Sequence, residues 1–356
     1  MAKDSPTISV VVPTYNKSSY LELSLQSWCN QTFRDYELIL VDDGSTDSTP
    51  DIVSSFRTSL PLFAERTNNR GRAAARNHGI ALARGDLLVF CDDDRVVHPE
   101  FLQAHMAAHR GCPTGAAVIG WQLGLMTQLA ASMETPARML AALVLERPHL
   151  AVALRNGKTV TTFSRQEVVA DPAIIERHIL PDSWFETYVI PVHAVYGGDI
   201  TECPLAWSYG TTGNLSVPRD WVTGVGNFDT AFVGWGLEDT ELHYRLTAAG
   251  IRTLICPDAV NYHQNHPRDE LAQKWNWLRN ARTFLAKHPT LEVALYIQAE
   301  ITNLSLTQVF AILREARGLQ GTLLLAAYRQ LAINHADELT HCGDALAPAH
   351  PLQGVQ

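Results

Sequence analysis

Three consecutive aspartates at the end of an apolar run are the residues in this chain best suited to chemistry. Asp92, Asp93 and Asp94 directly follow Leu87–Cys91, an apolar run that reads as a buried strand. Side chains alternate along an extended chain, so Asp92 and Asp94 are expected on one side and Asp93 on the other. Two carboxylates on one side form an oxygen site for Mg²⁺ or Mn²⁺, which can hold a diphosphate. The alternative is that these acids cap the following turn or helix.

A basic segment, residues 68–77, predicts an anion site at the start of a helix. It reads Asn-Asn-Arg-Gly-Arg-Ala-Ala-Ala-Arg-Asn and places Arg70, Arg72 and Arg76 at or near that start. The helix dipole disfavours positive charge there, and an anion resting on the amino end would reverse the penalty. The alternative is a set of solvated surface arginines.

A second carboxylate pair, Asp42 and Asp43, ends the predicted strand Leu38–Val41. A buried carboxylate needs a hydrogen-bond donor or a charge partner. The imide N–H of uracil or the ring N–H of guanine would be a suitable donor. The alternative is a turn into Gly44-Ser45, in which an aspartate binds its own backbone. We expect one aspartate to do each of these jobs.

The first hundred residues alternate predicted strands and helices. The strands cover 8–12, 38–41 and 87–91, and the helices lie near 21–28, 50–56 and 71–83. This order predicts a parallel, doubly wound sheet with ligands at the carboxyl ends of its strands. Each polar segment described above lies at or near such an end.

The rest of the chain is less regular until about residue 208. Residues 123–145 could hold one or two apolar helices, and 172–196 is mixed and rich in aromatic residues. A helix at 238–249, a strand at 253–256, a helix near 271–278 and two amphipathic helices from 291 to about 334 follow. A loose tail ends the chain. We therefore predict four parts, which are residues 1–120, 121–207, 208–290 and 291–356.

Composition places the chain among ordinary globular enzymes. Its 356 residues are 46% hydrophobic and 18% charged, with a net charge of −9. The negative charge argues against a nucleic-acid or anionic-membrane surface. No stretch reaches the length of a membrane span, and the amino terminus has no apolar signal core. The scattered cysteines contain no C-x-x-C pair, so we expect reduced thiols and a cytoplasmic protein.

Six motifs, in order and with matching spacing, resemble the family-2 glycosyltransferases with the GT-A fold. The second half also resembles the galactosyltransferase carboxyl-terminal domain, and the resemblance covers about residues 7–120 and 208–288. It implies an α/β GT-A fold, with a mostly parallel doubly wound sheet and an added C-terminal helical region. The motifs are Pro13–Asn16, Val41–Asp47, Asn69–Asn77, Asp92–Asp94, Gly213–Val217 and Phe232–Glu241.

The resemblance also implies roles for the first-half residues. Asp43 would accept a hydrogen bond from the nucleotide base, Arg76 would contact the diphosphate, and Asp92 would reach the ribose or a water on the metal. Asp94 would ligate Mn²⁺ or Mg²⁺, and a histidine after the strand 253–256 would complete the site. His263 matches that position best, with His266 as the alternative. The implied nucleotide-binding residues are Pro13, Thr14, Tyr15, Asp43, Arg70, Arg76, Asp92 and Asp93, and the metal ligands are Asp94, Asp92 and His263.

In the second half, Asp239 would be the general base and Glu238 would bind an acceptor or donor hydroxyl. Transfer with inversion needs one carboxylate opposite the departing diphosphate, which takes the acceptor's proton. The glycines beside Trp235 allow the backbone to approach a sugar closely. The alternative is that these acids stabilise a helix amino end. Trp235, Gly236 and Asn214 are the predicted sugar or acceptor contacts.

These features together predict an inverting, metal-dependent glycosyltransferase. It would move a sugar from a UDP-sugar to a hydroxyl of a glycan, natural-product or peptide acceptor. One rival is a sugar-nucleotide pyrophosphorylase, but residues 11–15 lack the G-x-G-T-R loop of those enzymes. The other is a catalytically silent nucleotide-sugar sensor, which the intact Glu238 and Asp239 disfavour. The C-terminal helices are expected to close the domain or to form a homodimer face.

Overall fold

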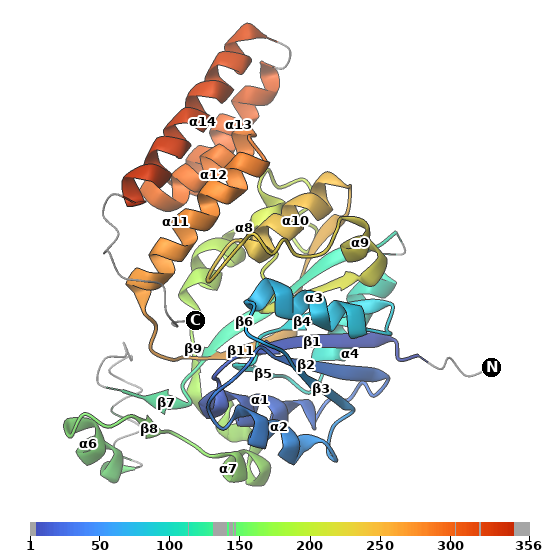
Figure 1. Cartoon of the computed structure of the whole chain (residues 1–356), viewed down its shortest axis with the longest axis vertical. Helices are drawn as coiled ribbons and strands as arrows, with labels where there is room; N and C mark the ends of the chain where they lie inside the picture. Colours follow the sequence, from blue (N-terminus) through green and yellow to red (C-terminus); the bar gives the residue numbers. More distant parts are fainter. Residues whose placement is uncertain are drawn as a thin grey trace.

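A mixed β-sheet forms the centre of the molecule (Figure 1). The computed structural model describes residues 5–112, 114–130, 141, 145, 147–302, 304–319 and 322–344. Three sequence-based expectations fall wholly or largely outside these residues. They concern the signal-free amino terminus, the possible helices at 123–145 and the loose tail. In order across the sheet, the strands are β3 (Leu62–Arg66), β2 (Tyr36–Asp42), β1 (Ile8–Thr14), β4 (Leu87–Cys91), β10 (Asn214–Pro218), β6 (Ala116–Leu125), β11 (Arg252–Gln264) and β5 (Arg95–Val97).

Most neighbouring strands run parallel, as the sequence predicts. β10 is antiparallel to both β4 and β6, and β5 is antiparallel to β11. Short β9 (Ile179–Leu180) pairs with β6, and β7 (Gln128–Leu129) pairs with β8 (Val160–Thr161). The sheet and its helices therefore have the α/β architecture that the sequence predicts.

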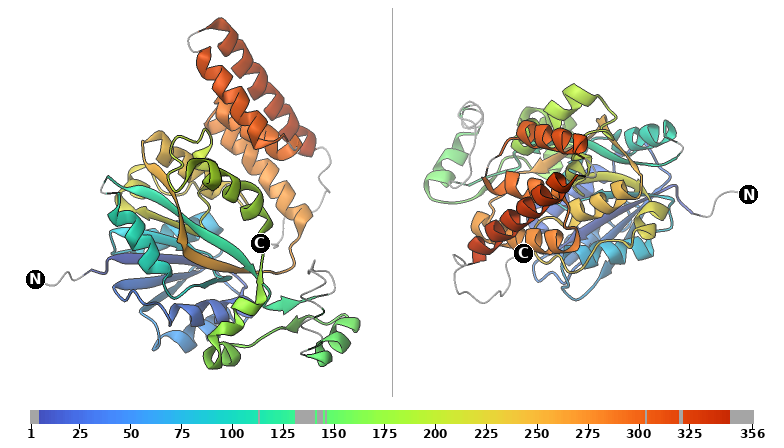
Figure 2. Two further views of the ribbon diagram at one scale, coloured as in Figure 1. Left: turned by 180° about the vertical axis from the view of Figure 1, so that it is seen from behind. Right: turned by 90° about the horizontal axis from the view of Figure 1, so that it is seen from above.

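Helices cover both faces of the sheet because the strands alternate their apolar side chains (Figures 1 and 2). Val10 and Val12 of β1 pack on one face, and Val11 packs on the other. The first face is covered by α1 (Ser18–Trp28), α2 (Thr49–Phe56) and α4 (Phe101–Arg110). The second is covered by α3 (Arg72–Leu82), α8 (Ile190–Tyr196), α9 (Arg219–Gly224) and α10 (Glu238–Ala248).

The segment between β6 and β10 is made of short elements. The helices α6 (Pro148–Arg155) and α7 (Arg165–Ala170) lie beside the β7–β8 pair, away from the C-terminal helices (Figure 1). Four short helical turns complete it, which are η1 (Pro172–Ile174), η2 (Glu176–His178), η3 (Phe185–Val189) and η4 (Ala206–Tyr209). Of these, η3 is a π-helix, a form often found at functional sites.

The chain ends in a helical extension that packs on the second half of the fold. It contains α11 (Glu270–Lys287), α12 (Leu291–Thr302), α13 (Leu306–Gly318) and α14 (Leu323–Asp344). The sequence predicted two helices from residue 291 onward, whereas the described residues of this part form three, α12, α13 and α14. Figure 2 shows them projecting from the sheet as a separate layer. No helix in the described ranges is both long and apolar enough to cross a membrane.

Candidate active site

The three aspartates lie in a turn and not in an extended chain. β4 ends at Cys91, and the amide N–H of Arg95 donates to the Asp92 carbonyl at 3.3 Å. The strand therefore ends before the aspartates, so the alternation expected of an extended chain does not apply to them. Asp92 and Asp94 consequently do not lie on one side. Asp92 turns to Arg76, with 3.0 Å between Oδ1 and Nη2, while Asp94 turns to His263 and His266.

Strand pairing brings Asp94 to the histidines. β5 pairs with β11 in a register that sets Arg95 opposite His263, so the turn before β5 lies beside the end of β11. Asp94 Oδ2 is 3.1 Å from His266 Nε2 and 3.7 Å from His263 Nε2. One ligand atom from each of the three residues lies within 4.8 Å of the others. The structure thus joins both histidines to Asp94, and Asp92 is not part of this group.

Electrostatics prepare this group for a cation. Burial and the nearby Arg95 guanidinium lower the pKa of His263 to about 4, so its imidazole is neutral and can ligate. Burial opposes ionisation of Asp94, yet His263, His266 and Lys17 hold the pKa of this carboxyl well below its usual range. A carboxylate and two imidazoles form a chemically suitable donor set for a transition-metal dication.

The two aspartates at the end of β2 have different hydrogen-bond partners. Asp42 accepts a hydrogen bond from the Ser45 amide at 2.8 Å, which is the turn alternative. Asp43 is 3% exposed and accepts from the Gly71 amide at 2.8 Å and the Arg70 amide at 3.0 Å. The Thr67 hydroxyl donates to the same carboxylate at 3.3 Å. Because a carboxylate offers about four acceptor positions, one remains for a nucleotide base. Burial raises the pKa of Asp43, so a further donor would favour its ionised form.

Arg76 does not lie where a diphosphate contact requires it. Its side chain is 2% exposed, and its guanidinium binds Glu238 Oε1 at 2.9 Å and Asp92 Oδ1 at 3.0 Å. This burial leaves no surface for a diphosphate, which corrects the role taken from the resemblance. Arg76 instead joins the aspartate turn of the first half to the start of α10 in the second. Arg70 at the α3 start is exposed and Arg72 half-exposed, so both keep a surface for an anion.

The remaining predicted nucleotide residues line the ends of β1 and β4. Thr14 and Asp93 are buried, whereas Pro13 and Tyr15 are half-buried. The Thr14 hydroxyl has no hydrogen-bond partner among the described residues. Burial, followed by the neighbouring Asp94, raises the pKa of Asp93 to about 7.

Asp239 and Glu238 begin α10, and a strained loop delivers them there. Gly234, Gly236 and Leu237 all have positive φ values, of 76°, 97° and 73°. Such a value is costly for leucine and marks backbone that the surrounding structure holds in place. The Thr212 amide donates to Asp239 Oδ2 at 3.2 Å, and the Thr240 amide donates to Oδ1 at 2.8 Å. Burial and the adjacent Glu238 raise the pKa of Asp239 to about 6.

Asn214 has no exposed surface, so it cannot touch a sugar, and its predicted role is corrected. Its side-chain oxygen lies 2.9 Å from His105 Nε2, and its amide donates to the carbonyls of Trp121 and Ala259. This side chain ties β10 to β6 and β11. Trp235, by contrast, is half-buried on the loop before α10.

Several residues of the site carry no sequence signal and were missed. Lys17, at the start of α1, places its ammonium 3.3 Å from Asp94 Oδ2. Arg268 reaches His263 with 3.0 Å between Nη2 and Nε2. Asn280 of α11 donates to the Gly236 carbonyl at 2.8 Å and accepts from the Val233 amide at 3.3 Å. Isolated basic or amide residues have no periodicity, so only the fold reveals their positions.

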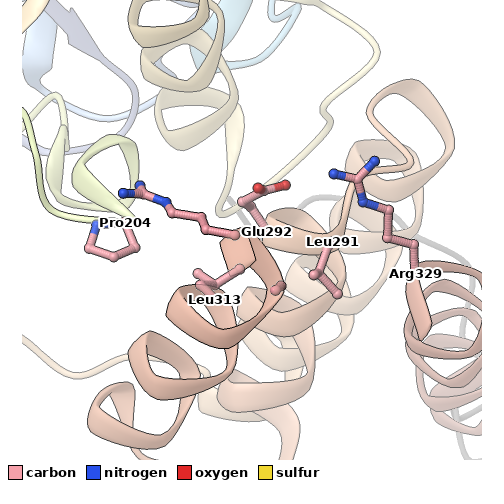
Figure 3. A pocket seen from close by; sticks show the side chains of 7 residues that line it. Pro204, Leu291, Glu292, Leu313 and Arg329 are labelled. Carbon is pink, nitrogen blue, oxygen red and sulfur yellow. The ribbon is translucent and has the colours of Figure 1, made fainter. Parts of the chain in front are cut away.

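A small pocket of about 50 Å³ lies elsewhere, among the C-terminal helices (Figure 3). Glu292 and Arg329 stand on either side of Leu291 in this view. None of the residues predicted for the site lines the pocket. Its lining residues are Pro204, Leu291, Glu292, Leu313, Ala316, Arg317 and Arg329.

Two family models match the chain, and both fall on the halves that build this site. Residues 9–125 match the model described as glycosyl transferase family 2. Residues 193–267 match the model described as the N-terminal domain of galactosyltransferase. The first match ends with β6, and the second contains β10, α10 and the two histidines.

Curated relatives cover most of the chain. A validoxylamine A glucosyltransferase of Streptomyces hygroscopicus subsp. jinggangensis is 32% identical over 82% of this chain and 63% of the relative. The uncharacterized glycosyltransferase YfnE of Bacillus subtilis is 30% identical over 73% of this chain and 65% of the relative. The chain therefore spans less than two thirds of the length of these relatives.

Solved structures share the fold at low identity. The S. aureus TarS 1–349 structure in complex with UDP-GlcNAc has a TM-score of 0.55 and is 17% identical, covering 96% of this chain and 84% of that one. The structure of GalNAc-T7 with UDP, GalNAc and Mn²⁺ has a TM-score of 0.51 and is 15% identical, covering 80% of this chain and 48% of that one.

Proposed function

Because the chain belongs to the family-2 glycosyltransferases and has their GT-A fold, we propose that it transfers a sugar from a UDP-sugar to a hydroxyl with inversion. One observation carries this proposal. Arg76 joins Asp92, in the turn that leads to the metal-ligand group, to Glu238, the neighbour of the candidate base Asp239. A donor site and an acceptor site would therefore meet at this ion pair.

We propose that Asp43 selects the base of the donor. Its remaining acceptor position suits the imide N–H of uracil, and Thr14 and Tyr15 would line the same pocket. A structural neighbour supports a nucleoside diphosphate donor, since S. aureus TarS was solved in complex with UDP-GlcNAc. The exposed Arg70 and half-exposed Arg72 at the α3 amino end would face the diphosphate in place of the buried Arg76.

The candidate metal ligands are Asp94, His263 and His266. Mg²⁺ prefers oxygen ligands alone, so a carboxylate with two imidazoles favours Mn²⁺. The ion, when bound, would neutralise charge that develops on the leaving diphosphate. The protein's part is to hold two imidazoles and one carboxylate close together.

Asp239 is the proposed general base. A pKa of about 6 keeps it ionised at neutral pH while leaving it more basic than an exposed aspartate. Backbone donors from Thr212 and Thr240 fix the orientation of its carboxylate. The Arg76 guanidinium binds Glu238 and offsets the negative charge of the Glu238 carboxylate beside Asp239. The same ion pair would position Glu238 to hold a hydroxyl.

The acceptor would lie beside the half-buried Trp235, on the loop that leads to the candidate base, where an aromatic face suits a hydroxylated partner. We propose a glycan or natural-product hydroxyl, in keeping with the name of the validoxylamine A glucosyltransferase.

Thermal stabilisation by nucleotides tests the donor proposal. UDP with Mn²⁺ should raise the melting temperature by mass action, and CDP should raise it much less because cytosine lacks the ring N–H. Equal shifts for the two nucleotides would remove Asp43 as the selecting residue, and a larger shift with GDP would change the donor class. UDP release from the preferred sugar nucleotide, with and without candidate acceptors, then separates an enzyme from a silent sensor.

We also propose that α14 offers a homodimer face. Leu323 and Leu331 are 91% and 67% exposed, and Tyr328 lies between them on the same helix. Light scattering coupled to gel filtration should report a dimer that Leu331→Lys converts to a monomer. A monomer at every concentration of the wild-type protein would exclude this face.

A further inference from the structure

Two positively charged side chains contact the candidate metal ligands. Lys17 Nζ lies 3.3 Å from Asp94 Oδ2 and 3.0 Å from His266 Nε2. Arg268 Nη2 lies 3.0 Å from His263 Nε2. Each of the three ligand atoms therefore faces an ammonium or a guanidinium.

The hydrogen-bond geometry shows which nitrogen lone pairs are involved. Lysine and arginine side chains only donate, so a hydrogen bond from Lys17 to His266, or from Arg268 to His263, uses the lone pair of a ring nitrogen. Asp94 Oδ2 lies 3.1 Å from the same His266 Nε2, and Arg268 Nη2 also lies 3.4 Å from His263 Nδ1. His266 Nδ1 lies 3.0 Å from the Pro267 carbonyl oxygen and donates to it, so in the neutral imidazole Nε2 carries the lone pair, with Lys17 Nζ 3.0 Å away. These are the lone pairs that a metal ion would need.

Both cations can leave without a change in the backbone. The Lys17 side chain is 24% exposed and Arg268 is exposed, so each reaches the ligands from the surface on a flexible stem. Arg95, the third neighbouring cation, is different because its Nε lies 3.9 Å from Asp94 Oδ1 in a buried position on β5. Its guanidinium packs against Gly213, where an added Cβ would meet Nη2 at 2.8 Å.

The charges balance in an exchange of this kind. A divalent ion brings two positive charges, and Lys17 and Arg268 together bring two. A metal ion that entered while Lys17 and Arg268 stayed would be repelled by their charges at close range. The ligand lone pairs that it needs would also be engaged by these two side chains. The donor diphosphate supplies new anionic partners, for which ammonium and guanidinium groups are well suited.

We propose that Lys17 and Arg268 hold the metal site closed in the free protein and move to the donor diphosphate when the ion binds. This inference rests on the proposed function. Metal and nucleotide would then bind cooperatively, because each removes the obstacle to the other. Coupling of this kind is reciprocal, so UDP must tighten Mn²⁺ binding by the factor by which Mn²⁺ tightens UDP binding.

Mn²⁺ binding measured by electron paramagnetic resonance, with and without UDP, tests the exchange on the full chain. In the wild-type protein, UDP should tighten Mn²⁺ binding by at least about tenfold, a typical size for coupled sites. Lys17→Met should bind Mn²⁺ alone about tenfold more tightly and lose most of the coupling. Arg268→Met, at an exposed position, should act in the same direction if Lys17→Met fails to fold. Lys158→Met, at an exposed lysine outside the site, should match the wild type.

The outcomes separate this inference from the function on which it rests. Tight Mn²⁺ binding that is independent of UDP in the wild type would overturn the exchange and leave the donor site intact. Unchanged coupling in both Lys17→Met and Arg268→Met would overturn it as well. A wild-type protein that binds neither UDP nor Mn²⁺ under any condition would instead overturn the proposed function, and the exchange with it.

Discussion

At the scale of single residues, Asp239 links the fold to the proposed chemistry. Asp239→Asn keeps the size of the side chain and removes its basicity. We expect sugar transfer to fall by about 10²–10⁴, the usual loss for a general base, while nucleotide affinity is preserved. Single-turnover rates and donor affinities measured side by side check this. Transfer within a few-fold of wild type, or a product that keeps the donor's anomeric configuration, would exclude the single-displacement mechanism.

The pH dependence of Asp239 gives a second expectation with a defined sign. Its pKa rises from 3.8 to about 6 on folding, so the base is lost as pH falls below 6 and kcat/KM should fall with it. Between these values the folded protein holds a proton that the unfolded chain has released, so stability decreases as pH rises through this window. Asp239→Asn should therefore melt higher than wild type above pH 6 and at the same temperature below about pH 4. Parallel melting curves at every pH would contradict the raised pKa.

Asp94 is the residue on which the metal proposal depends. Asp94→Ala should abolish turnover and metal-dependent UDP binding, because the two histidines alone leave the site without its only carboxylate. Asp92→Ala is the matched control, since Asp92 binds Arg76 outside the ligand group and should weaken metal binding far less. Isothermal titration with Mn²⁺ distinguishes the two variants. Wild-type activity in excess chelator would exclude the metal.

At the scale of elements, α11 holds the loop that carries Trp235 in place through hydrogen bonds. Asn280 binds both the Val233 amide and the Gly236 carbonyl, and Asn280→Ala would leave these groups unsatisfied. We expect a loss of about 1–3 kcal/mol in unfolding free energy and a lower kcat, because the loop also sets the start of α10. Lys274→Ala, at an exposed position on the same helix, is the control for denaturant titration. Equal stability of the two variants would show that the loop is held by other contacts.

Sequence patterns predicted the elements that carry strong periodicity. β4 was predicted to the residue, and the starts of α2, α10 and β2 fell within two residues of their observed positions. β11 was predicted only to Cys256 because Pro257 and Asp258 interrupt the apolar pattern. The structure continues the strand to Gln264 after an irregularity between Cys256 and Val260, and that continuation carries His263. The strand β5, which is only three residues long, has too few residues to show a pattern.

The site was predictable by residue type and much less by side-chain direction. Asp94 and His263 were named as metal ligands from the family resemblance, and the structure brings their side chains together with that of His266. Asn214 was misplaced because its direction depends on two partner strands that are distant in sequence. Arg76 was misplaced because its burial is set by α10, more than 150 residues later.

At the scale of the whole molecule, the C-terminal helices share a core with the catalytic half. Trp207 packs edge-on against Phe284 and Tyr296 and is 5% exposed, so it belongs to this core and not to a sugar site. Leu237, directly before the candidate catalytic acids, belongs to the same cluster. The extension therefore supports the start of α10 as well as covering one side of the domain.

Removal of residues 291–356 should consequently destabilise the protein more than removal of a surface extension would. The deletion exposes a core that includes Trp207, Phe284 and Leu237, so we expect a protein that is insoluble or lacks a cooperative melting transition. A soluble, cooperatively folded product of this deletion would show that the extension is an independent unit.

The antiparallel strand β10 also has a consequence for how the chain acquires its structure. β6 is joined to the β1–β4 side of the sheet only through β10, whose residues lie about ninety positions further along the chain. During synthesis β4 therefore stays an open edge, and β6 has only the two-residue strand β9 beside it, until residue 218 has left the ribosome. Pairings between such distant segments form slowly and leave strand edges exposed to aggregation. A fragment that stops at residue 125 would end at the boundary of the first family match. It would nevertheless lack β10, the strand that joins β6, its own last strand, to the other strands.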